Sequence, residues 1–243
     1  MADVDLDRLA VSYAHRPPTP ASLRRAADAG ERLRPRSRIL DVGGGLGNHA
    51  SVWRDGGHHP IVLDPSGGML RTVYARGLAA VRGRAQDIPF RNGTFDLVWF
   101  HLSIHYGDWR RAVDEADRVV ATPGRVEIWT LGPDHHEQSL LTRWFPTVGA
   151  IDRDRFPKPE AVAERLGARF PEVATDHFVE VVTRSASSWI AAVEAGFVST
   201  LQLLSDEERR SGIEAARRRY ADPDEEVHYE MRYTRITADR LPD

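Results

Sequence analysis

The sequence predicts an α/β fold, a doubly wound sheet that is mostly parallel and carries helices on both faces. Two observations predict it. Short apolar runs alternate with helix-forming segments between residues 20 and 132, and the connections that join them are short. Successive parallel strands need a crossover connection, and a helix packed on one face of the sheet usually provides it.

The first part of the chain supplies five strands and four helices. Thr19 and Pro20 are a helix N-cap and a proline at the first helical position, so a helix should begin there and end near Leu33. Gly56 and Gly57 end the helix that follows the first strand. The helix at 109–121 is amphipathic, with apolar side chains at helical spacing. The strands expected here are 38–42, 60–64, 79–82, 95–100 and 125–131, and the helices are 20–33, 48–55, 66–76 and 109–121.

The second part of the chain is less regular. Residues 133–160 show no strand–helix alternation, and we expect them to form a lid together with the N-terminal 30 residues. Ser205-Asp206-Glu207-Glu208 is a capping box that opens a helix. The helices expected here are 159–166, 187–204 and 205–220, and the strands are 178–182 and 228–237. The sheet should therefore have seven strands, the last of them antiparallel.

Composition excludes several classes of protein. The 243 residues are 41% hydrophobic and 28% charged, which is typical of a globular chain. Cysteine is absent, which excludes disulfides, cysteine–metal sites and thiol catalysis. The net charge of −3 gives no basic surface for nucleic acid, and no apolar run is long enough for a membrane span or a secretory leader. We expect a cytoplasmic protein, monomer or homodimer. Lys158 is the only lysine among the 33 lysine and arginine residues, and such a preference for arginine is typical of proteins from GC-rich bacterial genomes.

The glycine loop at residues 43–47 is the most informative stretch. Glycines at positions 43, 45 and 47, directly between a strand and a helix, let the backbone turn sharply and approach a ligand closely. The dinucleotide pattern would need glycine at position 48, which is Asn48, and the Gly-Lys-Ser/Thr of a P-loop does not occur. Asp41 stands at the strand end instead. Its carboxylate would repel a pyrophosphate and suits a ligand with an ammonium or sulfonium group.

Two further acids follow the same pattern. Asp64 and Asp87 fall at the carboxyl ends of the next two strands, as Asp41 does at the carboxyl end of the first. The carboxyl ends of the strands are where open α/β sheets bind ligands. A single such aspartate would be read as a loop cap, but three in succession beside a glycine loop favour a binding site. Two vicinal hydroxyls suit one bidentate carboxylate, and an exocyclic amine suits an acceptor at its edge.

These residues resemble the class I S-adenosylmethionine-dependent methyltransferases, in particular the small-molecule "type 11" branch that includes ubiquinone and menaquinone methyltransferases. The resemblance covers roughly residues 13–131. It rests on the segments Tyr13-Ala14-His15-Arg16-Pro17, Ile39 to Gly47, Asp64 with Met69, Gln86-Asp87-Ile88-Pro89-Phe90, Phe95-Asp96-Leu97-Val98 and Leu102-Ser103-Ile104-His105-Tyr106.

The resemblance implies a Rossmann-like fold and S-adenosyl-L-methionine as cofactor, with S-adenosyl-L-homocysteine as product. It implies that the glycine loop holds the methionine part, that Asp64 binds both ribose hydroxyls, and that Asp87 accepts from the adenine amine while Met69 lies under the ring. The implied cofactor-binding residues are Tyr13, Arg16, Asp41, Gly43, Gly45, Gly47, Asp64, Pro65, Met69, Asp87, Ile88 and His101.

On this basis we expect one methyltransferase domain over residues 1–243, because no linker or repeat divides the chain. We divide it into an N-terminal lid segment, a cofactor-binding core, a lid over the acceptor, and a C-terminal part that completes the sheet. These are residues 1–33, 36–132, 133–175 and 176–243. The expected function is transfer of a methyl group to a small, aromatic or apolar acceptor on oxygen, nitrogen or carbon. The alternatives are transfer of another group from the same cofactor and a non-catalytic scaffold.

Candidate catalytic residues follow the fourth strand. Displacement at a sulfonium methyl mainly needs alignment of the reacting atoms, and it needs a base only when the acceptor must lose a proton. Histidine suits that task near neutral pH, so His101 and His105 are candidates for a base or for positioning. Each has an alternative reading as a structural residue.

The acceptor pocket is expected to take residues from both lids. The candidates are His15, Tyr106, His135, Trp144 and Phe145. Adjacent histidines such as His135 and His136 point in different directions, so no metal site is expected. Trp109 and Trp129 fall on core-facing positions and should serve packing. The only partner expected is the small acceptor, with no nucleic acid and no membrane.

Overall fold

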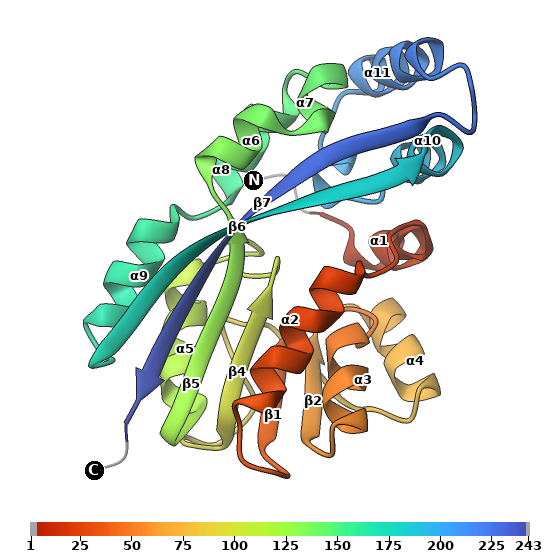
Figure 1. Ribbon diagram of the computed structural model, residues 1–243. Coiled ribbons are helices and arrows are strands. Elements are labelled where there is room, and N and C mark those ends of the chain that lie inside the picture. The colour runs from red at the N-terminus through yellow and green to blue at the C-terminus, as the bar shows by residue number, and fades with distance from the viewer. Residues whose placement is uncertain (1–3, 242–243) are drawn as a thin grey trace.

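The computed structural model describes residues 4–241, and its centre is one sheet of seven strands in the order β3-β2-β1-β4-β5-β7-β6 (Figure 1). β1 to β5 pair in parallel, and β7 lies antiparallel between β5 and β6. The doubly wound sheet and its antiparallel last strand are therefore confirmed. The strands are β1 (Arg38–Val42), β2 (His59–Asp64), β3 (Ala79–Arg82), β4 (Phe95–His101), β5 (Val120–Leu131), β6 (Glu172–Ser185) and β7 (Glu226–Arg240).

Helices cover both faces of the sheet because neighbouring residues of each strand point to opposite sides. Ile39 of β1 packs in one buried cluster with α2, α3 and α4, while Leu40 packs in another with α5 and α9. The helices are α1 (Leu6–Ser12), α2 (Pro20–Glu31), α3 (Asn48–Asp55), α4 (Gly67–Ala75), α5 (Trp109–Val119), α6 (Pro133–Gln138), α7 (Leu140–Trp144), α8 (Val148–Arg155), α9 (Pro159–Gly167), α10 (Ala186–Ala195) and α11 (Asp206–Arg219), with 3-10 turns η1 (Tyr13–His15) and η2 (Ser199–Gln202). Among residues 4–241, none of these is both long and apolar enough to cross a membrane.

The second half of the chain is more regular than the sequence predicts. Residues 133–160 contain three short helices, α6 to α8, and both late strands are much longer than expected. The helix expected over 187–204 is interrupted because Gly196, in the left-handed conformation at φ 70°, ends α10. β6 and β7 pair over 14 positions, and their far ends run out beside α10 and α11 (Figure 1).

A third buried cluster lies between the segment around α7 and the helices α10 and α11. Phe145, which directly follows α7, and Trp189 of α10 pack there with residues of α11. α9 behaves differently from the helices before it, since Val162 and Leu166 are buried against the sheet with α5. Within residues 133–175, α9 therefore covers one face of the sheet, and α6 contacts β7 through His135.

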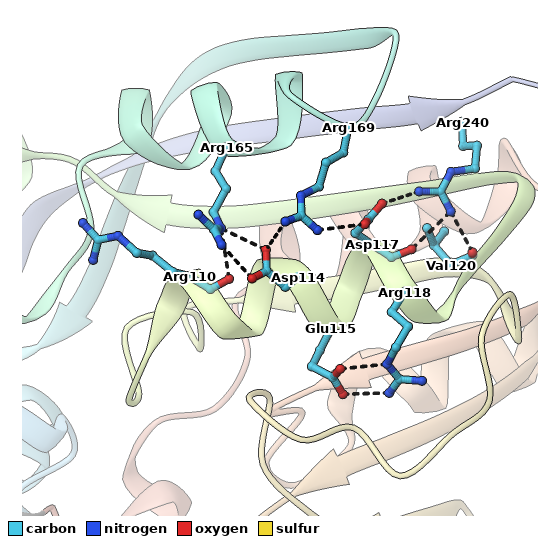
Figure 2. A network of polar contacts seen from close by, with 9 residues as sticks. All are labelled: Arg110, Asp114, Glu115, Asp117, Arg118, Val120, Arg165, Arg169 and Arg240. Atoms are coloured by element: carbon cyan, nitrogen blue, oxygen red, sulfur yellow. Dashed lines mark hydrogen bonds and ion pairs between the residues drawn. The ribbon is translucent and has the colours of Figure 1, made fainter.

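An acidic row on α5 joins that helix to α9 and to the end of β7 (Figure 2). Asp114 accepts from Arg165 at 2.6 Å and from Arg169 at 2.9 Å. Asp117 accepts from Arg169 at 3.1 Å and from Arg240. The Arg240 guanidinium also donates to the backbone oxygens of Asp117 and Val120. This network holds one face of the sheet together at a distance from the glycine loop.

Asp117→Asn should lower the free energy of unfolding by about 1 kcal/mol, because the carboxylate pairs with two arginines from different elements. Urea unfolding followed by circular dichroism measures it. The control is Asp55→Asn, whose ion pair with Arg54 is mostly exposed and should contribute less than about 0.5 kcal/mol. Equal losses in the two variants would contradict a structural role for the network.

Candidate active site

A cavity of about 390 Å³ opens where β1 and β4 end. Its walls come from parts of the chain that are far apart in sequence. The glycine loop and the end of β4 form its floor, and residues 13–22 form one side. The remaining walls come from residues 135–156, from β6 and β7, and from the segment 189–200. The sheet therefore positions the loop, and the later helices enclose the space above it.

Asp41 is the most constrained polar residue of the cavity. It lies one residue before the end of β1 and is 1% exposed, and it accepts a hydrogen bond from the backbone of Ala50 in the first turn of α3. Its Oδ2 atom has no partner among residues 4–241. Burial and the neighbouring Asp64 raise the pKa of Asp41 to about 7. A buried carboxylate with a free oxygen is suited to a positively charged ligand group.

The glycines of the loop have different tasks. Gly43 and Gly45 line the cavity with φ of 66° and 54°. Gly44 also lines it, and a Cβ there would stand 2.5 Å from the Asp41 carboxylate, so only glycine lets the loop pack against that acid. The alternating pattern of the sequence did not single out Gly44. Gly47 lies outside the cavity at the start of α3, where a Cβ would meet Leu78 at 2.9 Å.

Asp64 supports the loop from behind. Its two oxygens accept from the backbone N–H groups of Gly45, at 3.0 Å, and Ser66, at 2.8 Å. Burial raises its pKa, and these two donors offset part of that effect. Asp64 does not line the cavity, although the loop that it holds does.

The other residues expected around an adenosine are also outside the cavity. Met69 is buried with its sulfur near Gly45, and Ile88 is part of the core beside α5. Pro65 and Asp87 lie nearer the surface after β2 and β3. α1 packs over this side of the sheet, where Asp7 accepts from Ser66 and from the N–H of Gly68. The residues expected to bind the methionine part of the cofactor therefore line the cavity together. Those expected to bind its adenosine part lie outside the cavity.

The N-terminal segment lines the cavity through Tyr13 and residues 16–20. The Tyr13 ring lies 3.7 Å from the position of a Cβ on Gly45. Arg16 follows it into the cavity wall, with its guanidinium 5.7 Å from the Tyr13 ring centre and no ion-pair partner among residues 4–241. Arg184 of β6 donates to the backbone oxygen of His15 at 3.0 Å. The side chain of His15 is exposed and outside the cavity, so its contribution is this backbone contact.

His101 is surrounded by aromatic rings. Its ring centre lies 4.7 Å from that of His49 and 6.2 Å from Trp99, which is parallel to it. Nε2 of His101 is enclosed and has no partner among residues 4–241. Burial, then His49 and Arg25, hold its pKa well below the usual value, so the ring is neutral near pH 7. His49 itself, which donates to or accepts from Ser22 at 2.8 Å, was not indicated by the sequence.

His105 and Tyr106 line the cavity after the end of β4. The His105 ring stacks on Phe156, with centres 3.8 Å apart, and burial together with Arg155 and Arg16 lowers its pKa well below the usual value. Burial raises the pKa of Tyr106 to about 12. Near pH 7 both side chains are therefore neutral, and the tyrosine hydroxyl keeps its proton.

His135 lines the outer part of the cavity, but the other aromatic candidates of that region do not. Phe145 is 0% exposed in the cluster under α11, where a Cβ on Gly212 would stand 2.2 Å from its ring. Trp144 packs beside Tyr220, with ring centres 6.0 Å apart. These two placements correct our expectation of pocket residues: the pair anchors α7 to α11. A glycine inside the helix at 206–219 was the available signal of such a close contact.

Charged groups at the outer end of the cavity are mutually satisfied. Arg155 donates to Thr200 at 2.9 Å and to Ser199 at 3.0 Å, and it lies 3.7 Å from Asp152. Asp152 also accepts from the Thr200 hydroxyl. Within the described chain, no group of three His, Cys, Asp or Glu side chains is placed to hold a metal ion.

Comparison with known proteins agrees with this geometry. Residues 40–128 match the family model described as "Methyltransferase domain". A malonyl-[acyl-carrier protein] O-methyltransferase of Erwinia billingiae is 33% identical over 130 residues, which is 52% of this chain and 51% of that protein. An uncharacterized methyltransferase of Mycobacterium tuberculosis is 27% identical over 139 residues, 53% of this chain and 55% of that protein. The chain spans about half the length of these relatives.

Solved structures extend the likeness of fold to nearly the whole chain. A crystal structure from Anabaena variabilis superposes with a TM-score of 0.72 at 16% identity, covering 89% of this chain and 96% of that one. The geranyl diphosphate C-methyltransferase of Streptomyces coelicolor, solved with S-adenosyl-L-homocysteine, gives 0.55 at 16% identity and covers 91% and 79%. Residues 40–128 match a methyltransferase domain, and the chain is similar to S-adenosylmethionine-dependent methyltransferases over this part of the sequence and in its fold.

Proposed function

We propose that this protein transfers a methyl group from S-adenosylmethionine to an oxygen of a small acceptor that carries a carboxylate on an apolar body. The observation that carries the proposal is Asp41, a buried carboxylate with one unpartnered oxygen at the glycine loop. The remaining support comes from the charges and hydrogen-bond donors that face the same cavity.

The cavity floor fits the amino-acid part of the cofactor. Asp41 would accept from its ammonium group, and Arg16, which has no ion-pair partner among residues 4–241, would bind its carboxylate. Gly45 leaves the loop open to close approach, whereas at Gly43 a Cβ would stand 2.5 Å from the Cβ of Ser103, so glycine there lets the loop pack against the segment after β4. We assign the ribose to Asp64 and the adenine to Met69, Asp87, Pro65 and Ile88 by resemblance, and this assignment requires α1 to leave room on that side of the sheet.

When bound, S-adenosylmethionine supplies a methyl carbon whose bond to sulfur breaks, with the electron pair leaving on sulfur, as the acceptor oxygen forms the new bond. The chain's own contribution is alignment and exclusion of water. Tyr13 closes over the glycine loop, and Arg184 ties the backbone of His15 to β6. His101 and His105 border the space in which the methyl group and the acceptor would meet.

The acceptor should arrive already ionised because the site offers no strong base. Burial keeps the pKa values of His101 and His105 far below neutrality, which makes each a weak proton acceptor. Asp152 is already engaged by Thr200 and Arg155. A carboxylate carries no proton near pH 7 and needs no base, whereas a phenol or an enol would need one.

Donors in the outer part of the cavity also favour a carboxylate. Burial raises the pKa values of Tyr106, Tyr229 and Tyr233, so their hydroxyls remain protonated and can donate. Apolar side chains such as Leu140, Phe197 and Met231 would contact the rest of the acceptor. The malonyl group named in the Erwinia relative also ends in a carboxylate, which supports an acid as acceptor here.

Two alternatives share the cofactor site. Transfer of a different group would leave a product other than S-adenosylhomocysteine, and a scaffold would bind the cofactor without turnover. The residue divisions 1–33, 36–132, 133–175 and 176–243 and the quinone branch of the family remain proposals. The unpartnered oxygen of Asp41 favours a ligand-binding site, since a buried unsatisfied carboxylate destabilises the unliganded fold, and formation of S-adenosylhomocysteine distinguishes methyl transfer from both alternatives.

Asp41→Asn should weaken binding of S-adenosylhomocysteine at least ~10-fold near pH 8, since a hydrogen bond to a charged group contributes about 1.5–3 kcal/mol. Because the pKa of Asp41 is raised to about 7, the wild-type protein should bind more tightly as the pH rises through that value, and the variant should not.

The same raised pKa means that the folded wild type binds a proton that the unfolded chain releases. Its stability should fall as the pH rises from about 4 to about 7, and the variant should lack this fall. Titration calorimetry and thermal unfolding measure the two effects.

The matched control for this substitution is Asp28→Asn on α2, where the aspartate is exposed and away from the cavity. It should leave affinity, its pH dependence and stability unchanged. If Asp41→Asn binds S-adenosylhomocysteine as tightly as the wild type both below and above the pKa of Asp41, the assignment of the ammonium site is wrong.

Malonyl-coenzyme A and acetyl-coenzyme A form a matched pair of acceptors, because only the first has a free carboxylate. With S-adenosylmethionine, we expect a mass gain of one methyl group on the acid and none on acetyl-coenzyme A, together with formation of S-adenosylhomocysteine. Benzoate and octanoate extend the test to aromatic and aliphatic acids. Methylation of phenols or amines with none of the acids as acceptor, measured by mass spectrometry, would overturn the carboxylate assignment.

A further inference from the structure

His135 lies at the point where strand β5 ends and also lines the cavity. It lies in the first turn of α6, just after β5, which pairs with β7 up to Leu131 and Tyr233. Beyond that pair, the next backbone N–H on β7 is that of Arg232, and it donates to Nδ1 of His135 at 3.2 Å. The imidazole thus supplies a hydrogen-bond acceptor for β7 at the point where β5 ends and no longer offers a backbone oxygen.

This hydrogen bond fixes the position of the ring proton. A backbone N–H can only donate, so Nδ1 must be without a proton. Burial, His136 and Arg232 lower the pKa of His135 to about 4, and the ring is therefore neutral near pH 7. A neutral imidazole carries one proton, and here it must be on Nε2.

The Nε2 atom is available to a ligand. His135 is 7% exposed and lines the cavity, and its Nε2 has no hydrogen-bond partner among residues 4–241. It is not enclosed by protein either, in contrast to both ring nitrogens of the adjacent His136. The outer part of the cavity therefore holds a rigid N–H donor whose direction is set by the sheet.

We propose that His135 uses this Nε2–H to bind an oxygen of the methyl acceptor and thereby determines which acceptors fit. The inference rests on the proposed function and deepens it. Nε2 already carries a proton and Nδ1 is occupied, so His135 cannot serve as the base and acts by positioning. An acceptor with a carbonyl or carboxylate oxygen at this place gains a hydrogen bond. An ammonium group would meet a second donor there and be disfavoured.

Two substitutions separate the two nitrogens. Asparagine at position 135 places an oxygen near the position of Nδ1, where it can accept from Arg232, but it offers nothing at Nε2. Glutamine reaches the position of Nε2 with an N–H donor but leaves the Arg232 N–H without its acceptor. H135N should therefore keep the wild-type melting temperature and lose acceptor affinity. H135Q should keep acceptor affinity and melt a few degrees lower.

The binding measurement uses protein saturated with S-adenosylhomocysteine and titrated with malonyl-coenzyme A, benzoate and octanoate. We expect H135N to weaken the dissociation constant of the tightest of these acids about 10-fold or more, and H135Q to change it less than about 3-fold. The affinity for S-adenosylhomocysteine should be unchanged in both variants. Equal acid affinity in H135N and wild type, or failure of every acid to bind, would overturn the inference.

Nuclear magnetic resonance tests the ring proton without any acceptor. Long-range ¹⁵N–¹H spectra of the wild-type protein should show His135 as the neutral Nε2–H form near pH 7. A protonated ring or an Nδ1–H form would overturn the inference even if the protein methylates acids. Absence of S-adenosylhomocysteine binding by the wild type would instead contradict the proposed function, so the two failures are distinguishable.

Discussion

The burial of Asp41 is the constraint on which the site depends. A carboxylate that is taken from water and keeps one oxygen unpartnered is costly, and its raised pKa expresses that cost. The fold supports it with the N-terminal turn of α3 and with a glycine at position 44 that leaves room for it. Asp64 then holds the same loop through the N–H of Gly45. Strand β1, the loop and helix α3 thus present one anionic acceptor to the cavity, and a cationic ligand group would relieve the cost.

Histidine and tyrosine side chains that are neutral near pH 7 form part of the remaining wall, beside Arg16, Arg184 and Asp152. Burial keeps His101, His105 and His135 without a second proton and keeps the cavity tyrosines protonated. Such a wall can orient an acceptor but moves protons poorly. Chemistry at this site would therefore depend on alignment and on an acceptor that is already ionised, which is how the neutral histidines and the proposed carboxylate fit together.

The sequence predicted the structure correctly where the local chemistry of a residue type determines its conformation or its place in the fold. Glycines 43 and 45 at positive φ, and Asp41 and Asp64 at the ends of β1 and β2, follow from backbone sterics and from the topology of parallel sheets. It failed where tertiary contacts decide. Trp144 and Phe145 look like pocket residues in an irregular stretch, but Gly212 draws Phe145 into a core under α11. His49 and the capping role of His135 depend on neighbours far away in sequence, and no local pattern reveals them.

The central claim is that the glycine loop and Asp41 bind the amino-acid part of an adenosyl ligand and not a pyrophosphate. Calorimetric titration of the wild-type protein with S-adenosylmethionine, S-adenosylhomocysteine and NADH tests it most directly. The account predicts micromolar binding of the two adenosyl ligands and no binding of NADH. Binding of NADH, or of none of the three ligands, would contradict it.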